Sequence, residues 1–208
     1  MAAVFVCREV TTSEVVRLMK LNKRRTRVHS AMPTWTSQWR RWLACAMLCL
    51  GSASPVAGQE LAEYQVKAAF LYNFAVFAEW PSAVGDVLKL CVYGRDPFGS
   101  SIDSLNDKII NARRLGVVRR TNLNSIKDCQ IVFVTSSEIG QLPRILEILS
   151  ALPVLIVADS PGAARRGAAI NLTMTQGHVL FEVNLLSLHA ARLGMSSKVL
   201  GLAKEVIQ

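Results

Sequence analysis

Histidine is scarce in this chain of 208 residues, with three in all, and the familiar catalytic signatures are missing. His178 falls in a predicted strand and His189 in a predicted helix. The sequence has no Gly-x-Ser-x-Gly elbow, P-loop, His-Glu-x-x-His pair or dinucleotide-binding fingerprint. No two histidines or carboxylates stand at metal-ligand spacing with a third nearby. These absences argue against an enzyme, a resident metal and a bound cofactor.

Long apolar runs are also missing. The run at residues 42–50 falls short of the roughly 20 residues that a transmembrane helix needs. Arg40 and Arg41 precede it, and small residues lead from Gly51 to Gly58. This is the layout of a secretory signal peptide, so we expect cleavage after Gly58 and a mature chain that begins near Gln59. An uncleaved membrane anchor is the alternative.

The signal peptide begins well inside the chain. Met32 lies just before it, and residues 32–58 have an ordinary signal-peptide length. Residues 1–31 are basic and show no apolar period. We therefore predict that they are an extension that arises from a misassigned translation start. The alternative is a nucleic-acid-binding arm built on the basic residues 23–27.

The excess of positive charge belongs mostly to this leader. The net charge is +9, from 24 basic and 15 acidic residues. Nine basic and two acidic residues precede Gln59, which leaves 15 and 13 and a mature domain of +2. Nucleic-acid binding requires a basic patch on the folded domain, so we expect no nucleic acid among the partners.

Cysteine is sparse as well, with five residues, of which Cys91 and Cys129 remain in the mature chain. Two cysteines in an oxidising compartment form a natural pair. Their spacing does not fit a Cys-x-x-Cys redox or zinc motif. We therefore predict a disulfide between Cys91 and Cys129.

The remaining pattern predicts one α/β domain over residues 59–208. An apolar stripe that includes Phe70, Phe74 and Phe77 predicts a helix from 63 to Trp80, ended by Pro81. Strands are expected at 88–93, 115–118, 129–134 and 153–158, with a hairpin of 169–173 and 178–183. Helices are expected at 100–105, at 139–149 after a Ser136-Ser137 cap, and twice at the end. The fold class is a three-layer-like sandwich, with a mixed, mainly parallel sheet, a C-terminal hairpin and flanking helices.

Five residues are candidates for a partner or ligand surface: Arg95, Asp96, Phe98, Glu182 and Asn184. The first three lie in the loop 94–99, which follows a strand as a phosphate loop does. Its proline and phenylalanine suit a turn better, with Asp96 as cap and Phe98 packed inward. Glu182 in an apolar strand needs a partner such as Arg192, and Asn184 is placed to cap the next helix. A structural ion pair and a cap are the alternative roles.

The chain resembles the YfiR-like family of periplasmic regulators across nearly the whole mature region. The resemblance is carried by residues 63–74 with Glu79-Trp-Pro81, by 91–99 and 129–134, and by 159–162, 181–184 and 190–197. The chain departs from the family at Ala163-Ala164 and at Gly167-Ala168, where an aromatic residue and a Gly-Gly pair are usual.

The resemblance implies a regulator. Characterised relatives repress an inner-membrane diguanylate cyclase through its periplasmic domain, and an outer-membrane lipoprotein relieves that repression. Cyclic di-GMP output and biofilm formation follow in the Gram-negative host, while many members are domains of unknown function. The alternative is a small-molecule-binding module that serves a histidine kinase or another membrane receptor. A homodimer is left open.

Overall fold

The computed structural model describes residues 56–208, with side chains from Ala62 onward. The predicted extension, 1–31, and nearly all of the predicted signal peptide, 32–58, lie outside the described residues. The described residues all belong to one compact unit. In the described part of the chain, no helix is both long enough and apolar enough to cross a bilayer.

The fold is built on an eight-stranded sheet with the order β10-β8-β7-β6-β5-β2-β4-β3. Its strands are β2 (Val87–Tyr93), β3 (Ile109–Ile110), β4 (Arg113–Arg120), β5 (Ile131–Val134), β6 (Leu155–Ala158), β7 (Ile170–Thr175), β8 (His178–Asn184) and β10 (Glu205–Ile207). All neighbours are parallel except β3–β4 and β7–β8. The predicted mixed, mainly parallel sheet is therefore confirmed.

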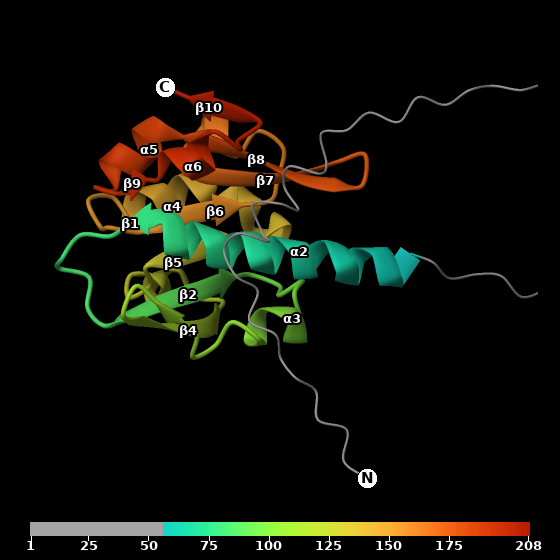
Figure 1. Cartoon of the computed structure of the whole chain (residues 1–208), viewed down its shortest axis with the longest axis horizontal. Helices are drawn as coiled ribbons and strands as arrows, with labels where there is room; N and C mark the ends of the chain where they lie inside the picture. The colour runs from blue at the N-terminus through green and yellow to red at the C-terminus, as the bar shows by residue number, and fades with distance from the viewer. Residues whose placement is uncertain (1–55) are drawn as a thin grey trace, which may run out of the picture. The chain divides into compact units, whose positions relative to one another are not determined.

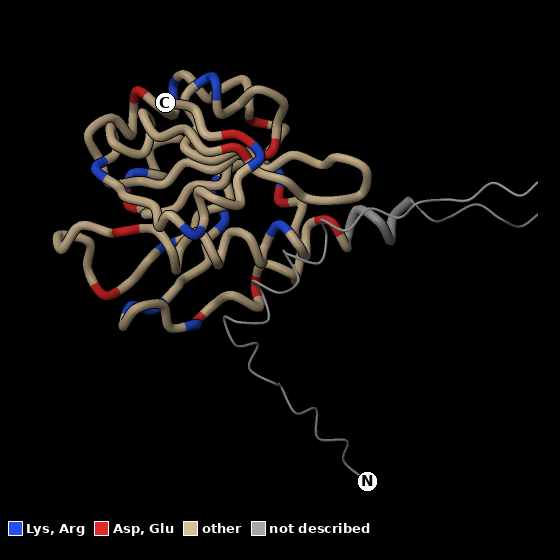
Figure 2. Tube along the Cα trace, turned by 45° about the horizontal axis from the view of Figure 1, so that its top comes forward, with Lys and Arg blue, Asp and Glu red and all other residues tan. Residues whose placement is uncertain are grey.

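Helices cover both faces of this sheet. The long helix α2 (Val56–Phe77) crosses one face, in front of the strands in Figure 1. The helix α4 (Leu142–Ile148) and two short 3-10 helices, η1 (Leu123–Ile126) and η2 (Ser136–Gln141), lie on the other side. The remaining helical turns are α3 (Ser100–Asp103), η3 (Ala164–Arg166), α5 (Leu185–Ala190) and α6 (Ser197–Leu200). Basic and acidic residues are interspersed over the domain (Figure 2).

Two apolar cores follow from the alternation of side chains along each strand. Leu88, Leu90 and Val92 of β2 point toward α2, where Leu71 and Phe74 are fully buried. Cys91 and Tyr93 point to the other face and pack with residues of α4 and η1. The central strands β5 and β6 are buried throughout, as expected for parallel strands covered on both faces.

The β7–β8 hairpin forms as predicted around Gln176 and Gly177, which have φ values of 50° and 78°. Two consecutive positive φ angles are what a two-residue hairpin turn of type I′ requires. Asn111 and Ala112 (49° and 69°) join β3 to β4 in the same way.

Several local predictions were wrong at their ends. The helix α2 ends at Phe77 rather than Trp80, because Ala78–Glu79 form β1, which pairs with β9 (Gly194–Met195). Of the phenylalanines in the predicted apolar stripe, Phe74 is buried, whereas Phe70 and Phe77 are half-buried. Val66 of the same helix is 45% exposed. The segment after Ser136 begins as a 3-10 helix, and its N-cap is Thr135. The short strands β1, β3, β9 and β10 were missed, because two or three residues carry no period.

Candidate functional site

The loop that follows β2 packs against the loop that follows β5. Gly94 has a φ of 106°, and a Cβ there would overlap Thr135 Oγ1 and Glu138 Cγ. The Arg95 backbone N–H donates to Ser137 Oγ at 3.2 Å. The chain passes from β2 to β4 on one side and then to β5 on the other, so this is the switch point where open α/β sheets bind ligands. Thr135, Ser137 and Glu138 pack closely against Gly94 at this point.

Asp96 and Phe98 have structural roles in that loop. Asp96 Oδ1 accepts from the Phe98 N–H at 2.7 Å, which is the predicted cap. The Phe98 ring is fully buried, and its centroid lies 5.1 Å from that of Tyr64 and 4.8 Å from that of Phe133. Arg95 is exposed.

Arg119 of β4 ties this loop to α3. Its guanidinium donates to Asp96 Oδ2 at 2.7 Å, to Asp103 Oδ1 at 2.7 Å and to the Gly99 carbonyl at 2.9 Å. The hydrogen bond from Arg119 holds the pKa of Asp103 below its usual value. The hydrogen bonds that Arg119 donates to Asp103 and to Asp96 raise the pKa of Arg119 in turn.

The strand β8 places Glu182 and Asn184 elsewhere. Glu182 Oε2 accepts from Asn171 Nδ2 at 3.2 Å, and no ion pair with Arg192 is present among the described residues. The predicted ion pair is therefore wrong: the neighbouring strand supplies an amide opposite Glu182. Asn184 caps α5 as predicted, because its Oδ1 accepts from the Ser187 N–H at 2.9 Å. Its Nδ2 also donates to the Ala164 carbonyl at 2.8 Å.

The five candidate residues do not form one site. Arg95, Asp96 and Phe98 follow β2, whereas Glu182 and Asn184 belong to β8. The strands β5, β6 and β7 lie between β2 and β8 in the sheet. The two groups must therefore act separately if either contacts a partner.

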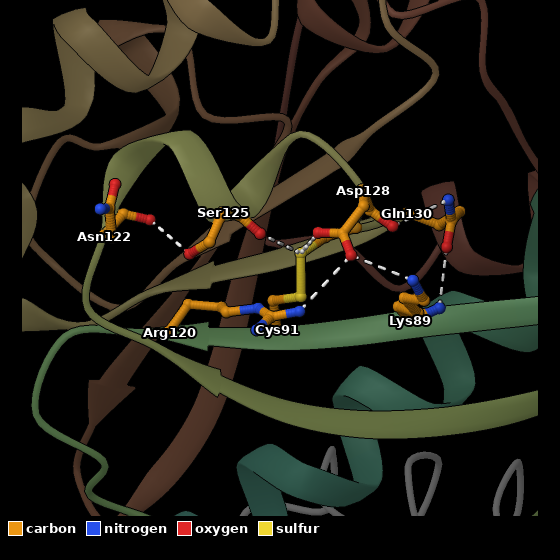
Figure 3. Close-up of a disulfide and its surroundings, with 8 residues drawn as sticks. Lys89, Cys91, Arg120, Asn122, Ser125, Asp128 and Gln130 are labelled. Atoms are coloured by element: carbon orange, nitrogen blue, oxygen red, sulfur yellow. Dashed lines mark hydrogen bonds and ion pairs between the residues drawn. A yellow bond between two sulfur atoms is a disulfide. The ribbon is translucent and has the colours of Figure 1, made fainter.

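Cys91 and Cys129 are joined by a disulfide, with their Cα atoms 6.0 Å apart. It links β2 to the segment just before β5, beside a small cluster of charges (Figure 3). Asp128 accepts from Lys89 Nζ at 3.0 Å and lies 3.4 Å from an Arg120 nitrogen. The hydrogen bond from Lys89, assisted by Arg120, lowers the pKa of Asp128.

A buried charged cluster at the carboxyl end of β6 was missed by the sequence analysis. It consists of Asp159, Lys67, Glu63 and Tyr64. Asp159 Oδ2 accepts from Lys67 Nζ at 3.1 Å and from the Tyr64 hydroxyl at 2.8 Å. Glu63 Oε1 lies 2.6 Å from Lys67 Nζ, which also stands 4.3 Å from the Tyr64 ring centroid. Asp159 Oδ1 is buried without a hydrogen-bond partner among the described residues.

Two sequence signals point to this cluster. Glu63 and Lys67 are four residues apart on a predicted helix, so they share one face. Asp159 follows directly after an apolar parallel strand, at the end of the sheet where polar groups gather. Neither signal predicts that Lys67 contacts Asp159.

Neither a cluster of metal ligands nor a buried histidine is found among the described residues. They contain no group of three or more His, Cys, Asp or Glu residues placed to hold a metal. His178 and His189 are both exposed, at the hairpin turn and on α5.

Comparison with known proteins gives one strong match. A family profile described as YfiR/HmsC-like matches residues 64–204. No curated protein matches the sequence.

Two solved structures resemble the chain more distantly. One is an ABC domain from Streptococcus pneumoniae in complex with L-Trp, with a TM-score of 0.46 at 8% identity. The other is a conserved domain protein from Vibrio cholerae, with a TM-score of 0.43 at 8% identity. Each match covers 69% of this chain and 60% of the other, so the chain spans about three fifths of those proteins.

Proposed function

Because this chain belongs to the YfiR/HmsC-like family of periplasmic regulators of cyclic di-GMP signalling, we propose that it represses an inner-membrane diguanylate cyclase. The observation that carries the proposal is the extent of the match. Residues 64–204 include seven of the eight strands of the sheet, all except β10. The regulatory role therefore belongs to the α/β domain itself.

The proposed mechanism is binding without catalysis. The charged side chains of the described clusters form ion pairs within the domain. Arg119 pairs with Asp96 and Asp103, Asp128 pairs with Lys89, and Lys67 pairs with Asp159. A repressor of this kind shifts its target only by binding one state more tightly than the other. To move a cyclase from 1:99 to 99:1 in favour of the inactive state, that difference has to be roughly 10⁴-fold.

We also propose that the domain acts in the periplasm. Cleavage near Gln59 would release the domain into the periplasm, where it meets the periplasmic part of the cyclase. An outer-membrane lipoprotein that binds the repressor would relieve the inhibition.

The test is the cyclic di-GMP level of a strain that lacks the gene. Deletion should raise it, and an exported wild-type chain supplied from a plasmid should lower it again. An unchanged level in both strains would contradict repression. A sensor module is then the alternative, and thermal-shift screening detects it, because a ligand stabilises the folded state by mass action.

A further inference from the structure

Only one sulfur-containing residue is exposed in the described part of the domain. The residues that carry sulfur there are Cys91, Cys129, Met174 and Met195. Both cysteines are bound in the disulfide and are 0% and 1% exposed. Met195 is 9% exposed, whereas Met174 is 41% exposed. Met174 is therefore the thioether that an oxidant in solution reaches most readily.

The sheet topology explains why Met174 is exposed. The strand β6 pairs with Ile170 and Asn171 of β7 and ends there. On the other side, β10 pairs with β8 only at Glu182–Asn184. Residues 172–180 of the β7–β8 hairpin have no strand partner among the described residues other than each other, and the hairpin projects beyond the sheet in Figure 1. Met174 lies close to the tip of this hairpin.

Met174 stands at the rim of the core that lies under α2. Side chains alternate along β7, so Met174 is on the same face as Ile170 and Leu172, which are both buried in that core. Its partner across the hairpin is Val179, a half-buried residue that packs against the same core. Met174 thus extends this apolar row from the core into water.

Met195 provides an internal comparison. It belongs to β9, where it pairs with Ala78 of β1, and it is part of the same buried core. A peroxide reaches a thioether in such a place only when the structure opens locally. The two methionines have the same side-chain chemistry, so the difference in burial should separate their rates of oxidation.

We propose that Met174 is a site of reversible oxidation, at which hydroperoxides convert the thioether to a sulfoxide. A lone pair of the sulfur attacks the terminal oxygen of the peroxide and forms the S–O bond, while the O–O bond breaks. The departing oxygen takes up the proton of the attacked oxygen and leaves as water or an alcohol. The sulfur loses two electrons and the peroxide gains them. Methionine sulfoxide reductases, with a thiol as reductant, reverse the reaction.

The position of Met174 decides the consequence of oxidation. A sulfoxide is polar, whereas the thioether is apolar. At the rim of the core the sulfoxide oxygen can accept a hydrogen bond from water, so the fold should tolerate it. At Met195 the same oxygen would be buried among apolar side chains without a partner, which would destabilise the fold. This inference rests on the structure alone and does not depend on the proposed repression.

The experiment treats the full chain, as expressed in a Gram-negative host, with hydrogen peroxide and follows each methionine by peptide mass spectrometry. Met174 should gain one oxygen at least about four times as fast as Met195, in line with their exposed fractions of 41% and 9%. In denaturing urea the two rates should become equal, because neither residue is then buried. Equal rates in the folded chain, or faster oxidation of Met195, would overturn the proposal.

Two matched variants check the site and its consequence. Met174→Leu and Met195→Leu each keep an apolar side chain of similar size. At a peroxide dose that oxidises most of Met174, the domain of Met195→Leu should gain one oxygen and that of Met174→Leu none. The melting temperature of oxidised Met195→Leu should stay within about 2 °C of its value before treatment, as for a change at the surface. A larger fall would contradict a tolerated site at the rim of the core.

Reversibility is tested on the oxidised, folded chain. It is incubated with a thiol reductant and both methionine sulfoxide reductases, one for each epimer of the sulfoxide. Return of Met174 to the thioether supports the proposal. Reduction that occurs only after denaturation would show that the oxidation of Met174 is not reversible in the folded protein.

Discussion

Lys67 Nζ lies 3.1 Å from Asp159 Oδ2, and the two side chains are 4% and 1% exposed. The pair joins α2 to the residue that follows β6, across 92 positions of sequence. It explains why a lysine is found on the inner face of α2.

Removing the lysine from this pair should destabilise the domain strongly. Lys67→Met leaves Asp159 charged and buried without its cation, which costs about 3–5 kcal/mol of unfolding free energy. Urea unfolding measures the loss. The double variant Lys67→Met/Asp159→Asn should recover most of it, because the charge left without a partner is then that of Glu63, whose side chain is 24% exposed.

The control for that prediction is Lys89→Met. The Lys89–Asp128 pair has a similar distance of 3.0 Å, but its side chains are 41% and 47% exposed. An exposed pair of this kind contributes less than about 1 kcal/mol. Equal losses for Lys67→Met and Lys89→Met would show that burial of the Asp159 pair has no energetic consequence.

Loss of the disulfide should also lower stability. The bond between Cys91 and Cys129 spans 38 residues. By the chain-entropy estimate, the double variant Cys91→Ser/Cys129→Ser should lose about 2–4 kcal/mol. Wild type unfolded in the presence of a reductant should match the variant. Two alkylatable thiols in the denatured, unreduced protein would mean that the bond does not form.

Replacing Ala151 with glycine should stabilise the domain. It follows α4 with a φ of 66°, a left-handed conformation that disfavours residues with a Cβ by about 1–2 kcal/mol. Ala151→Gly should therefore raise the unfolding free energy by about 0.5–1 kcal/mol. Ala69→Gly, in the exposed middle of α2, should lower it by a similar amount. A loss at both positions would contradict the backbone argument.

Acid should weaken the contact between Arg119 and Asp103. The ordinary pKa of this carboxyl group is 3.8, and in the folded protein the hydrogen bond from Arg119 lowers the pKa of Asp103 below that value. The contribution of the hydrogen bond to folding stability is therefore complete above the ordinary pKa, and it is lost as the pH falls through the lower pKa of the folded state. Wild type should lose more stability than Asp103→Asn between pH 5 and pH 2, as measured by urea midpoints. Asp107→Asn is the control, because the carboxylate of Asp107 is 71% exposed and 3.9 Å from Arg114.

Residues 1–58 should be absent from the exported protein. The charged residues Arg40 and Arg41, the apolar run and the small residues up to Gly58 predict cleavage before Gln59. N-terminal sequencing of periplasmic material from a Gram-negative host should begin near Gln59. A full-length product in the cytoplasm would refute export.

Local sequence patterns were sufficient for much of the fold. The strands β2, β5, β6, β7 and β8 were predicted within two residues at each end, because β-branched runs bounded by turn residues report directly on backbone preference. The Asp96 turn, the buried Phe98 and the Asn184 cap were predicted for the same reason. The turn and the cap each depend on residues within three positions of one another, whereas Phe98 packs against Tyr64 and Phe133, which are distant in sequence.

The sequence by itself determined the class of fold, the order of its main elements and the family, because these depend on periodicity, turn chemistry and motifs along the chain. Only the tertiary structure decided which distant residues meet. It set Asn171 rather than Arg192 against Glu182, and it put three strands between Glu182 and Asp96. It also turned Glu63 and Lys67 of α2 inward to Asp159. The physical reason is that sheet order and helix rotation are chosen by burial of the whole chain, which no short stretch of sequence records.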